Sequence, residues 1–405
     1  MSFPGISERF TRYTAFDTMS DERASLCRRP STDGQTALLN ALCDELREMG
    51  LDPYLGKESV VACHIEGNCP GVPVGFMAHV DTADAVEGNH VRAVLHKDYD
   101  GKPIELEGGI VIDPAEDPDL LLYKGCTVIT SSGDTLLGSD DKAGVAAIME
   151  AVSYMVSHPE FKHGPVDIFF TPDEETGHGT DEFPYDKLTG SICYTIDGGR
   201  EGAVELECFN ASKLIVRFHG TGCHLGSARG ILKNACTAAA AFISALPQAE
   251  SPEATDGRYG YYCVESMTAT LIEAEMNVYI RDFDSDMFQE RCLNIRALAE
   301  MIARLYGVGC EIVENTGYRN MAEANSKNPL AVKAVYDAGE KLGMHLEESL
   351  IRGGTDGARL AQKGIAAPNL FTGGHNLHSL KEWVAVEAME RSCALMLGII
   401  GEFAG

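Results

Sequence analysis

Three apolar segments in the first half of the chain each end in polar or acidic residues. They are VPVGFMAHVD (72–81), VDIFFTPDEE (166–175) and SICYTIDGG (191–199). Between the first two, apolar side chains recur with helical period from Val145 to Val156. Apolar strands that alternate with helices are typical of a buried sheet, which binds ligands at the carboxyl ends of its strands. The sequence therefore predicts an α/β fold with a mixed, mostly parallel sheet and helices on both faces.

The pattern changes near Phe209. The run KLIVRFHG (213–220) alternates like a strand, and a helix is expected at about 231–246. Two strands (261–272 and 275–282), a second helix and a short strand (310–313) should follow. This β-α-β-β-α-β order predicts a ferredoxin-like unit. We expect it to be a small domain, 209–320, inserted between two parts of the α/β domain, 1–208 and 321–405.

Charge and cysteine usage exclude several classes of protein. The 33 basic and 61 acidic residues give a formal net charge of −28, which repels phosphate backbones and anionic membranes. The 13 cysteines include no C-x-x-C pair, so thiols in a reducing compartment are more plausible than disulfides. We find no signal-peptide pattern at the N-terminus and no apolar run of membrane-spanning length. A cytoplasmic protein that binds neither nucleic acid nor membranes is expected.

Histidine and carboxylate side chains gather at the predicted strand ends. They are His79, Asp81, Asp140, Asp141, Glu174, Glu175, Asp197 and His378. Each alone has an ordinary explanation, such as a helix N-cap for the Asp140-Asp141 pair or a solvated acidic run for 173–175. Together they would repel one another unless cations compensated them. Imidazole and carboxylate without thiolate suit zinc, manganese or cobalt, and a shared carboxylate is typical of a pair of hydrolytic metal ions.

Seven sequence runs carry a resemblance to a known family. They are HVDT (79–82), LLGSDDKAG (136–144), FTPDEETG (170–177), YTIDGG (194–199), IRDFD (280–284), IRGGTDGA (351–358) and NLFTGGHNLH (369–378). In order and spacing they resemble the co-catalytic zinc peptidases that include carboxypeptidase G and the succinyl-diaminopimelate desuccinylases. The TPDEE and IRGGTDG runs are similar to those of its tripeptide-aminopeptidase branch.

The resemblance implies a metallo-aminopeptidase that removes the N-terminal residue from short peptides, chiefly tripeptides. Two zinc ions per chain are implied, with cobalt or manganese as substitutes. His79 and Asp197 would hold one ion, Glu175 and His378 the other, and Asp140 would bridge them. The peptide bond between Asp140 and Asp141 is expected to be cis, as in relatives.

Two further carboxylates have implied roles in catalysis. Glu174 would be the general base that takes a proton from the attacking water and returns it to the leaving amine. Asp81 would fix the tautomer of the His79 imidazole and raise its donor strength.

The inserted domain is expected to act as a lid, on the same resemblance. His224 would stabilise the oxyanion, and in dimeric relatives this histidine comes from the neighbouring subunit, so a homodimer through the lid is implied. Arg281 and Arg352 would hold carboxylate or carbonyl groups of the substrate, a task that suits the guanidinium fork. A surface salt bridge is the alternative for each arginine.

Three positions depart from the family pattern. Leu225 replaces a proline after His224, which loosens the turn that aims the imidazole. Ser139 stands where alanine is usual, and Ser-Leu-Lys (379–381) follows His378. The last two departures are expected to line the site and to shift substrate preference.

Other functions remain open on the residues alone. A related two-zinc hydrolase could act on dipeptides or N-acyl amino acids, and a metal-free scaffold protein could keep the same fold. Intact candidate ligands and an intact Glu174 count against the scaffold.

Overall fold

A computed structural model describes residues 3–56 and 59–405 of the chain. The chain divides into two compact units. The second unit comprises Glu207–Asn320 and Leu350–Gly354, and the first comprises the remainder. Residues 350–354, which carry Arg352, therefore belong with the second unit, whereas the sequence placed them within the α/β part 321–405.

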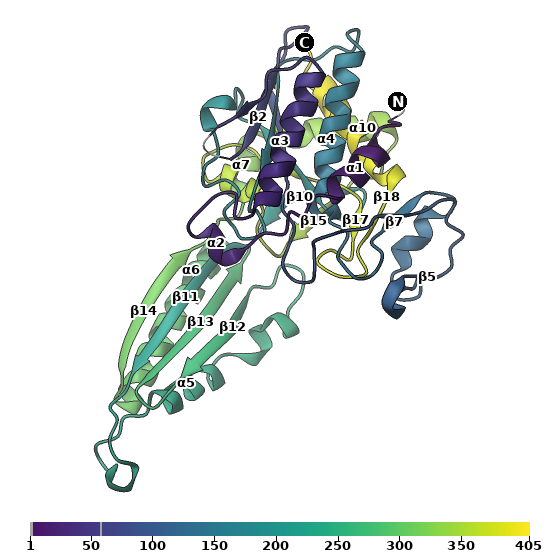
Figure 1. Ribbon diagram of the computed structural model, residues 1–405. Helices are drawn as coiled ribbons and strands as arrows, with labels where there is room; N and C mark the ends of the chain where they lie inside the picture. The colour runs from purple at the N-terminus through teal and green to yellow at the C-terminus, as the bar shows by residue number, and fades with distance from the viewer. Residues whose placement is uncertain (1–2, 57–58) are drawn as a thin grey trace. The chain divides into compact units, whose positions relative to one another are not determined.

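An eight-stranded sheet forms the centre of the first unit (Figure 1). Its strands in spatial order are β1 (Tyr54–Leu55), β2 (Val61–Ile65), β8 (Val166–Thr171), β3 (Val74–His79), β9 (Cys193–Gly198), β16 (Asn369–Phe371), β10 (Ala203–Cys208) and β15 (Glu347–Ile351). The strands from β8 to β16 pair in parallel, whereas β1 pairs antiparallel with β2, β2 with β8, and β10 with β16. The expected α/β fold, with a sheet that is parallel at its centre, is confirmed.

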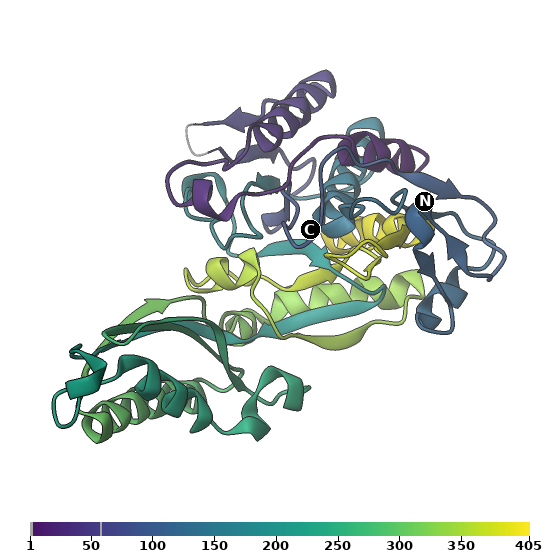
Figure 2. The ribbon, with the colours of Figure 1, turned by 60° about the horizontal axis from the view of Figure 1, so that its bottom comes forward.

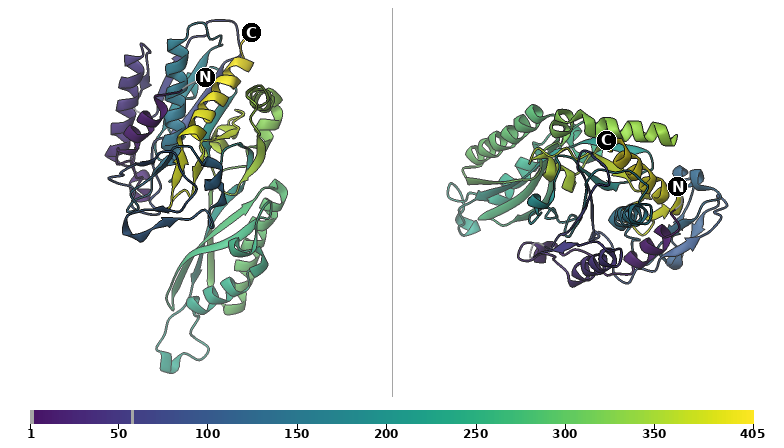
Figure 3. Two further views of the ribbon diagram at one scale, coloured as in Figure 1. Left: turned by 90° about the vertical axis from the view of Figure 1, so that its right-hand side faces the viewer. Right: turned by 90° about the horizontal axis from the view of Figure 1, so that it is seen from above.

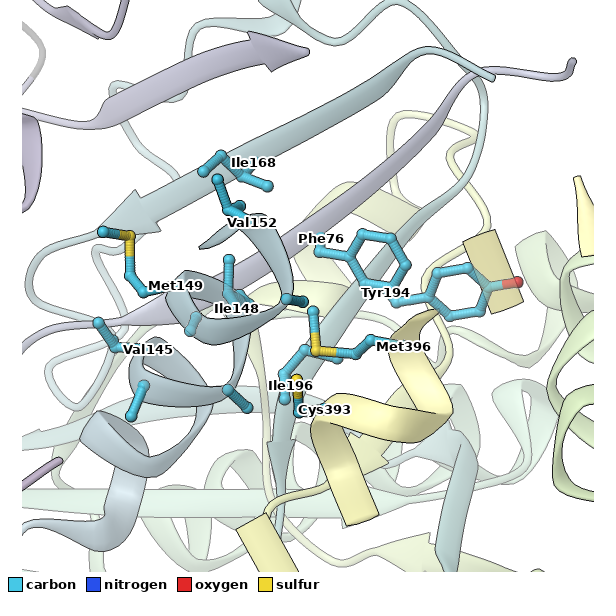
Figure 4. Close-up of a cluster of buried hydrophobic side chains, with 14 of the residues drawn as sticks. Phe76, Val145, Ile148, Met149, Val152, Ile168, Tyr194, Ile196, Cys393 and Met396 are labelled. Carbon is cyan, nitrogen blue, oxygen red and sulfur yellow. The ribbon is translucent and has the colours of Figure 1, made fainter. Parts of the chain in front are cut away.

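Five helices cover one face of this sheet and share its main core. They are α1 (Ile6–Thr14), α3 (Asp33–Glu48), α4 (Ser139–Ser157), α8 (Pro329–Leu342) and α10 (Val386–Glu402). Helix α4 is buried almost all round, and it runs beside α10 (Figure 3). Its side chains pack with Phe76 and Ile196 of the sheet and with Met396 of α10 (Figure 4). This packing fixes the first turn of α4 at the carboxyl ends of β3 and β9.

The opposite face of the eight-stranded sheet packs against less helical structure. Helix α9 (Asp356–Ala361) packs there through Leu360 against Met77, Phe169 and Cys193. The short helices α2 (Glu22–Ser25) and α7 (Ala322–Lys327) complete the α-helices of this unit. No helix in the described residues is long and apolar enough to cross a bilayer.

A second sheet of the first unit joins segments that are distant in the sequence. Its order is β17 (Gly374–His375), β18 (Trp383–Ala385), β7 (Val128–Thr130) and β4 (Val94–His96), all antiparallel. The pairing of β18 with β7 brings the chain around His378 next to the chain that leads into α4. The strands β5 (Ile104–Glu105) and β6 (Val111–Ile112) form a separate two-stranded sheet.

The second unit has the expected β-α-β-β-α-β order. Its elements are β11 (Asn210–His219), α5 (Ala235–Ser244), β12 (Tyr261–Ala269), β13 (Glu273–Asp282), α6 (Ser285–Tyr306) and β14 (Gly309–Thr316). The sheet order is β12-β13-β11-β14 and every pair is antiparallel. Helices α5 and α6 contact each other and share one core with the sheet (Figure 2).

The first helix of this unit is shorter than the sequence indicated. It begins at Ala235 because the side chain of Asn234 accepts a hydrogen bond from the backbone N–H of Thr237 and caps it. Lys233 instead pairs with Thr221 in a β-bridge. The apolar residues before Asn234 therefore belong to an exposed loop, where Ile231 is 53% exposed.

Candidate metal centre

The strand ends of the first unit bring the predicted ligands to one edge of the sheet. His79 ends β3, Asp197 lies near the end of β9, and Glu175 follows β8 by four residues. Asp140 lies in the first turn of α4, and His378 follows β17. Because β3, β8 and β9 are parallel, their carboxyl ends meet at this edge.

Asp140 lies between the two histidines. Its Oδ1 is 3.0 Å from Nε2 of His79, and its Oδ2 is 3.0 Å from Nε2 of His378. Each histidine also faces a second carboxylate. Nε2 of His79 is 3.4 Å from Oδ1 of Asp197, and Nε2 of His378 is 2.9 Å from Oε1 of Glu175. The five predicted ligands thus form two half-sites that share one carboxylate.

Asp141 also lies close to His79 and Asp197. Its carboxylate, however, accepts hydrogen bonds from the backbone N–H groups of His79 and Gly144. Those bonds hold its carboxylate against the backbone, and we assign Asp141 to the support of the loop rather than to ligation. The peptide bond between Asp140 and Asp141 is cis, which confirms the expectation from the family resemblance.

The electrostatics of the cluster favour bound cations. Burial alone would lower the pKa of His79, yet hydrogen bonds to Asp140 and Asp197 raise it well above its usual value. Hydrogen bonds to Asp140 and Glu175 raise the pKa of His378 to about 11. Burial raises the pKa of Asp197 and of Glu175 to about 7 each. Positive charge is therefore strongly attracted to the centre of the cluster, as protons or as metal ions.

The donor set fits divalent metal ions. It consists of two imidazoles and three carboxylates, without thiolate, which suits zinc, cobalt or manganese. Oε1 of Glu175 is buried and has no partner in hydrogen-bond geometry among the described residues, although His378 lies close to it. A metal ion would satisfy this oxygen. The residues present are therefore able to hold two ions, with Asp140 shared.

Glu174 and Glu175 are held in place through their backbone. The N–H of Glu174 donates to Oδ1 of Asp81 (3.0 Å), and the N–H of Glu175 donates to Oδ2 of Asp81 (3.1 Å). The preceding residue, Asp173, has a positive φ of 56°. Its carboxylate is buried and accepts hydrogen bonds from Ser31 and Gln35. The loop that carries the two glutamates is thus fixed on both sides.

Two of these carboxylates match predicted catalytic positions. The Asp81 carboxylate is fully buried, and its Oδ1 is 3.3 Å from Nδ1 of His79. The hydrogen bond of Nδ1 itself runs to the backbone carbonyl of Asp81. Burial raises the pKa of Glu174 well above its usual value, and neighbouring carboxylates add to this shift. A raised pKa makes a carboxylate a stronger proton acceptor, as a general base requires.

The other three predicted residues belong to the second unit. His224 caps a short 3₁₀ turn through Nδ1, which accepts from the N–H of Gly226. The guanidinium of Arg281 stacks on the rings of Tyr279 and Tyr318, at 5.1 and 5.6 Å from their centroids. Arg352 donates hydrogen bonds to the carbonyls of residues 255, 257 and 259 and to the Thr255 hydroxyl. These contacts bind Arg352 within its own unit.

Sequence reasoning missed Glu382, four residues after His378. Its buried carboxylate accepts hydrogen bonds from the loop that carries Asp140. Ser139 was expected to line the site, and this is wrong, whereas the expected shift of substrate preference stays a prediction. Its side chain is fully buried and its hydroxyl donates to Glu382. A glutamate immediately before the apolar run WVAV (383–386) was the available signal for a buried carboxylate.

Comparisons with known proteins point to one protein family. The sequence profile of peptidase family M20/M25/M40 matches residues 138–402. Peptidase T of Clostridium perfringens is 40% identical over 403 residues, which cover 98% of this chain and 99% of that protein. Aminopeptidase PepT from Bacillus cereus shares the fold with a TM-score of 0.77 at 20% identity, covering 100% of this chain and 99% of that one. A tripeptidase from Staphylococcus aureus has a TM-score of 0.78 at 18% identity, with 99% and 98% covered.

Proposed function

The chain belongs to peptidase family M20/M25/M40 and is a peptide hydrolase; on this premise we propose that it removes the N-terminal residue from short peptides, chiefly tripeptides. The observation that carries the proposal is the position of Asp140, whose two carboxylate oxygens each lie 3.0 Å from a different histidine. A shared carboxylate between two imidazole–carboxylate half-sites is the ligand arrangement of hydrolases that use two metal ions. The relatives known as peptidase T, an aminopeptidase and a tripeptidase support the choice of substrate.

We propose two zinc ions as the cofactor, with cobalt or manganese as substitutes. His79 and Asp197 would hold one ion, Glu175 and His378 the other, and Asp140 both. When bound, such ions activate water and polarise the peptide carbonyl. His79 and Asp197 lie at strand ends and Asp140 at a helix start, whereas Glu175 and His378 lie in loops that follow β8 and β17.

Glu174 is the proposed general base. Its carboxylate takes a proton from the attacking water and delivers it to the nitrogen of the leaving peptide as the bond breaks. Burial keeps its pKa well above the usual value, which strengthens its carboxylate as a proton acceptor. Asp81 holds the backbone of Glu174 and faces the ring of His79, which aligns the base with the ligand.

Residues of the second unit have proposed roles in substrate binding. His224 would stabilise the developing oxyanion, and Arg281 and Arg352 would contact carbonyl or carboxylate groups of the peptide. A homodimer through the second unit would present His224 to a partner subunit. His224→Ala should lower kcat by about 10²–10³-fold without loss of metal, the cost of one oxyanion donor. A wild-type kcat in this variant would remove His224 from the mechanism.

The cellular setting is also a proposal. The 13 cysteines all lie in the described residues and form no disulfide, which supports a reducing compartment such as the cytoplasm. The net charge of −28 supports the absence of nucleic-acid or anionic-membrane partners.

The proposed substrate class can be tested by product analysis. Zinc-loaded protein is incubated with di-, tri- and tetrapeptides of one sequence, and with the N-acetylated tripeptide as a matched control. The proposal predicts release of the first residue, fastest from the free tripeptide, with the acetylated peptide left intact. Preferred cleavage of the dipeptide or of the acetylated peptide would identify one of the alternative hydrolases. No cleavage of any peptide by metal-loaded protein would favour the scaffold function.

A further inference from the structure

The carboxylate of Glu382 is buried in the first unit and has an unusual set of partners. Glu382 is 1% exposed and lies between His378 and strand β18. In the described parts of the chain it forms no ion pair with lysine or arginine. A buried carboxylate without a cation is costly unless hydrogen bonds satisfy it. The partners that satisfy Glu382 therefore indicate what it holds in place.

Those partners are the backbone amides of four successive residues. Oε2 accepts from the N–H groups of Leu137 (2.7 Å) and Gly138 (2.9 Å). Oε1 accepts from the N–H groups of Ser139 (2.6 Å) and Asp140 (3.3 Å), and from the Ser139 hydroxyl (2.5 Å). The donors converge on one point because Gly138 has a φ of 78°, which turns the chain around the carboxylate. Such a series of N–H groups is a typical anion-binding concavity of protein backbones.

This contact joins two segments that both carry predicted ligands. Asp140, the last of the four residues, faces both histidines with its side chain. His378 is four residues before Glu382. The carboxylate therefore ties the loop of the shared ligand to the segment of the second histidine. In the same way, the carboxylate of Asp81 ties the loop of Glu174 and Glu175 to the segment of His79.

We propose that Glu382 is a positioning residue that holds Asp140 between the two metal half-sites, with the hydroxyl of Ser139 as an additional support. The inference rests on the proposed two-metal function. It assigns a purpose to Ser139, which is buried and donates to Glu382 instead of lining the site. Groups that orient metal ligands in this way typically contribute 10–100-fold to metal affinity or activity.

Cobalt binding by the full-length protein tests this role without reference to turnover. The probe is Co²⁺, titrated against a chromophoric chelator, with the visible cobalt spectrum recorded at saturation. Glu382→Gln points an amide N–H₂ group at the backbone donors and should weaken Co²⁺ binding by about 10–100-fold and change the spectrum. Ser139→Ala removes one bond of the set and should weaken binding in the same direction by a few-fold.

Glu201→Gln is the matched control. Glu201 lies in the first unit and accepts hydrogen bonds from the Tyr123 hydroxyl and the Arg391 guanidinium. This variant should lower the thermal stability and leave Co²⁺ affinity and spectrum unchanged. If Glu382→Gln behaves like Glu201→Gln, with wild-type affinity and spectrum, Glu382 only stabilises the fold and the inference is overturned.

Two further outcomes are decisive. Should Glu382→Gln fail to fold, wild-type Co²⁺ affinity in Ser139→Ala would overturn the inference, and weakened binding would support it. If the wild-type protein binds no Co²⁺, the proposed function fails together with the inference. Normal Co²⁺ binding by every variant removes only the inference.

Discussion

The carboxylate of Asp81 accepts a 3.0 Å hydrogen bond from the backbone N–H of Glu174. Its other oxygen accepts from Glu175, and the same carboxylate lies 3.3 Å from the ring of His79. One buried side chain therefore connects the proposed general base with a ligand from each half-site. Displacement of Asp81 is expected to disturb catalysis and metal binding at once.

Asp81→Asn should keep part of these contacts and break the rest. The amide keeps one acceptor oxygen, but its N–H₂ group faces a backbone N–H and leaves it unsatisfied, at a cost of about 1–3 kcal/mol. We expect a fall in kcat of at least about 10-fold and weaker zinc binding, measured by steady-state kinetics and by competition with a chelator. Unchanged kcat and zinc affinity would show that Asp81 does not position the glutamate loop.

Glu174→Gln and Glu175→Gln should separate the roles of two adjacent carboxylates. The first change removes the proton acceptor and should lower kcat by about 10²–10⁴-fold with full metal content. The second removes a ligand, so metal analysis should show the loss of one ion. Retention of more than about a tenth of kcat in Glu174→Gln would exclude Glu174 as the base.

The site ligands could be predicted because they depend on local patterns. Each follows or ends an apolar strand, or opens a helix, and the parallel sheet brings the strand ends together. The order of elements in the second unit could be predicted for the same reason, from strand alternation and helical period. The start of α5 was missed because one capping residue, Asn234, outweighs the apolar residues before it.

Residues whose role depends on distant backbone could not be predicted. Glu382 accepts hydrogen bonds from backbone N–H groups that lie more than 240 residues before it in the sequence. No local pattern relates the two segments. Arg352 is similar, because its partners in loop 255–259 are more than 90 residues away. Their pairing follows from tertiary packing, which a single sequence does not show.

Arg352→Ala is expected to act on the second unit itself. Its guanidinium donates four hydrogen bonds to loop 255–259, so its loss should expose that loop to proteases. Limited proteolysis with mapping of the cut sites measures this effect, and Arg281→Ala is the control. An unchanged cleavage pattern together with a raised KM would assign Arg352 to substrate binding alone.

Glu205 makes the stability of the first unit depend on pH. Its Oε2 accepts from the side-chain amide of Asn369, whose carbonyl accepts from the N–H of Asp197. Burial raises the pKa of Glu205 from 4.5 to about 7. Between these values unfolding releases a proton, so the free energy of unfolding falls as pH rises through this range and is constant above it.

Glu205→Gln should remove this dependence, because the amide is neutral and still accepts from Asn369. The variant should match the wild type near pH 4.5 and exceed its stability at pH 8 by up to about 3 kcal/mol. Urea unfolding of both metal-loaded proteins at the two pH values measures the difference. The same difference at both pH values would contradict a raised pKa at Glu205.

The cluster around Asp140 is expected to hold two metal ions that the hydrolysis requires. The direct measurement is a titration of zinc into chelator-treated protein, with the rate of tripeptide hydrolysis followed against equivalents of zinc per chain. We predict no hydrolysis before zinc is added and a rate that reaches its plateau at two equivalents. Full hydrolysis by the zinc-free protein, or a plateau at one equivalent, would show that hydrolysis does not require two bound metal ions.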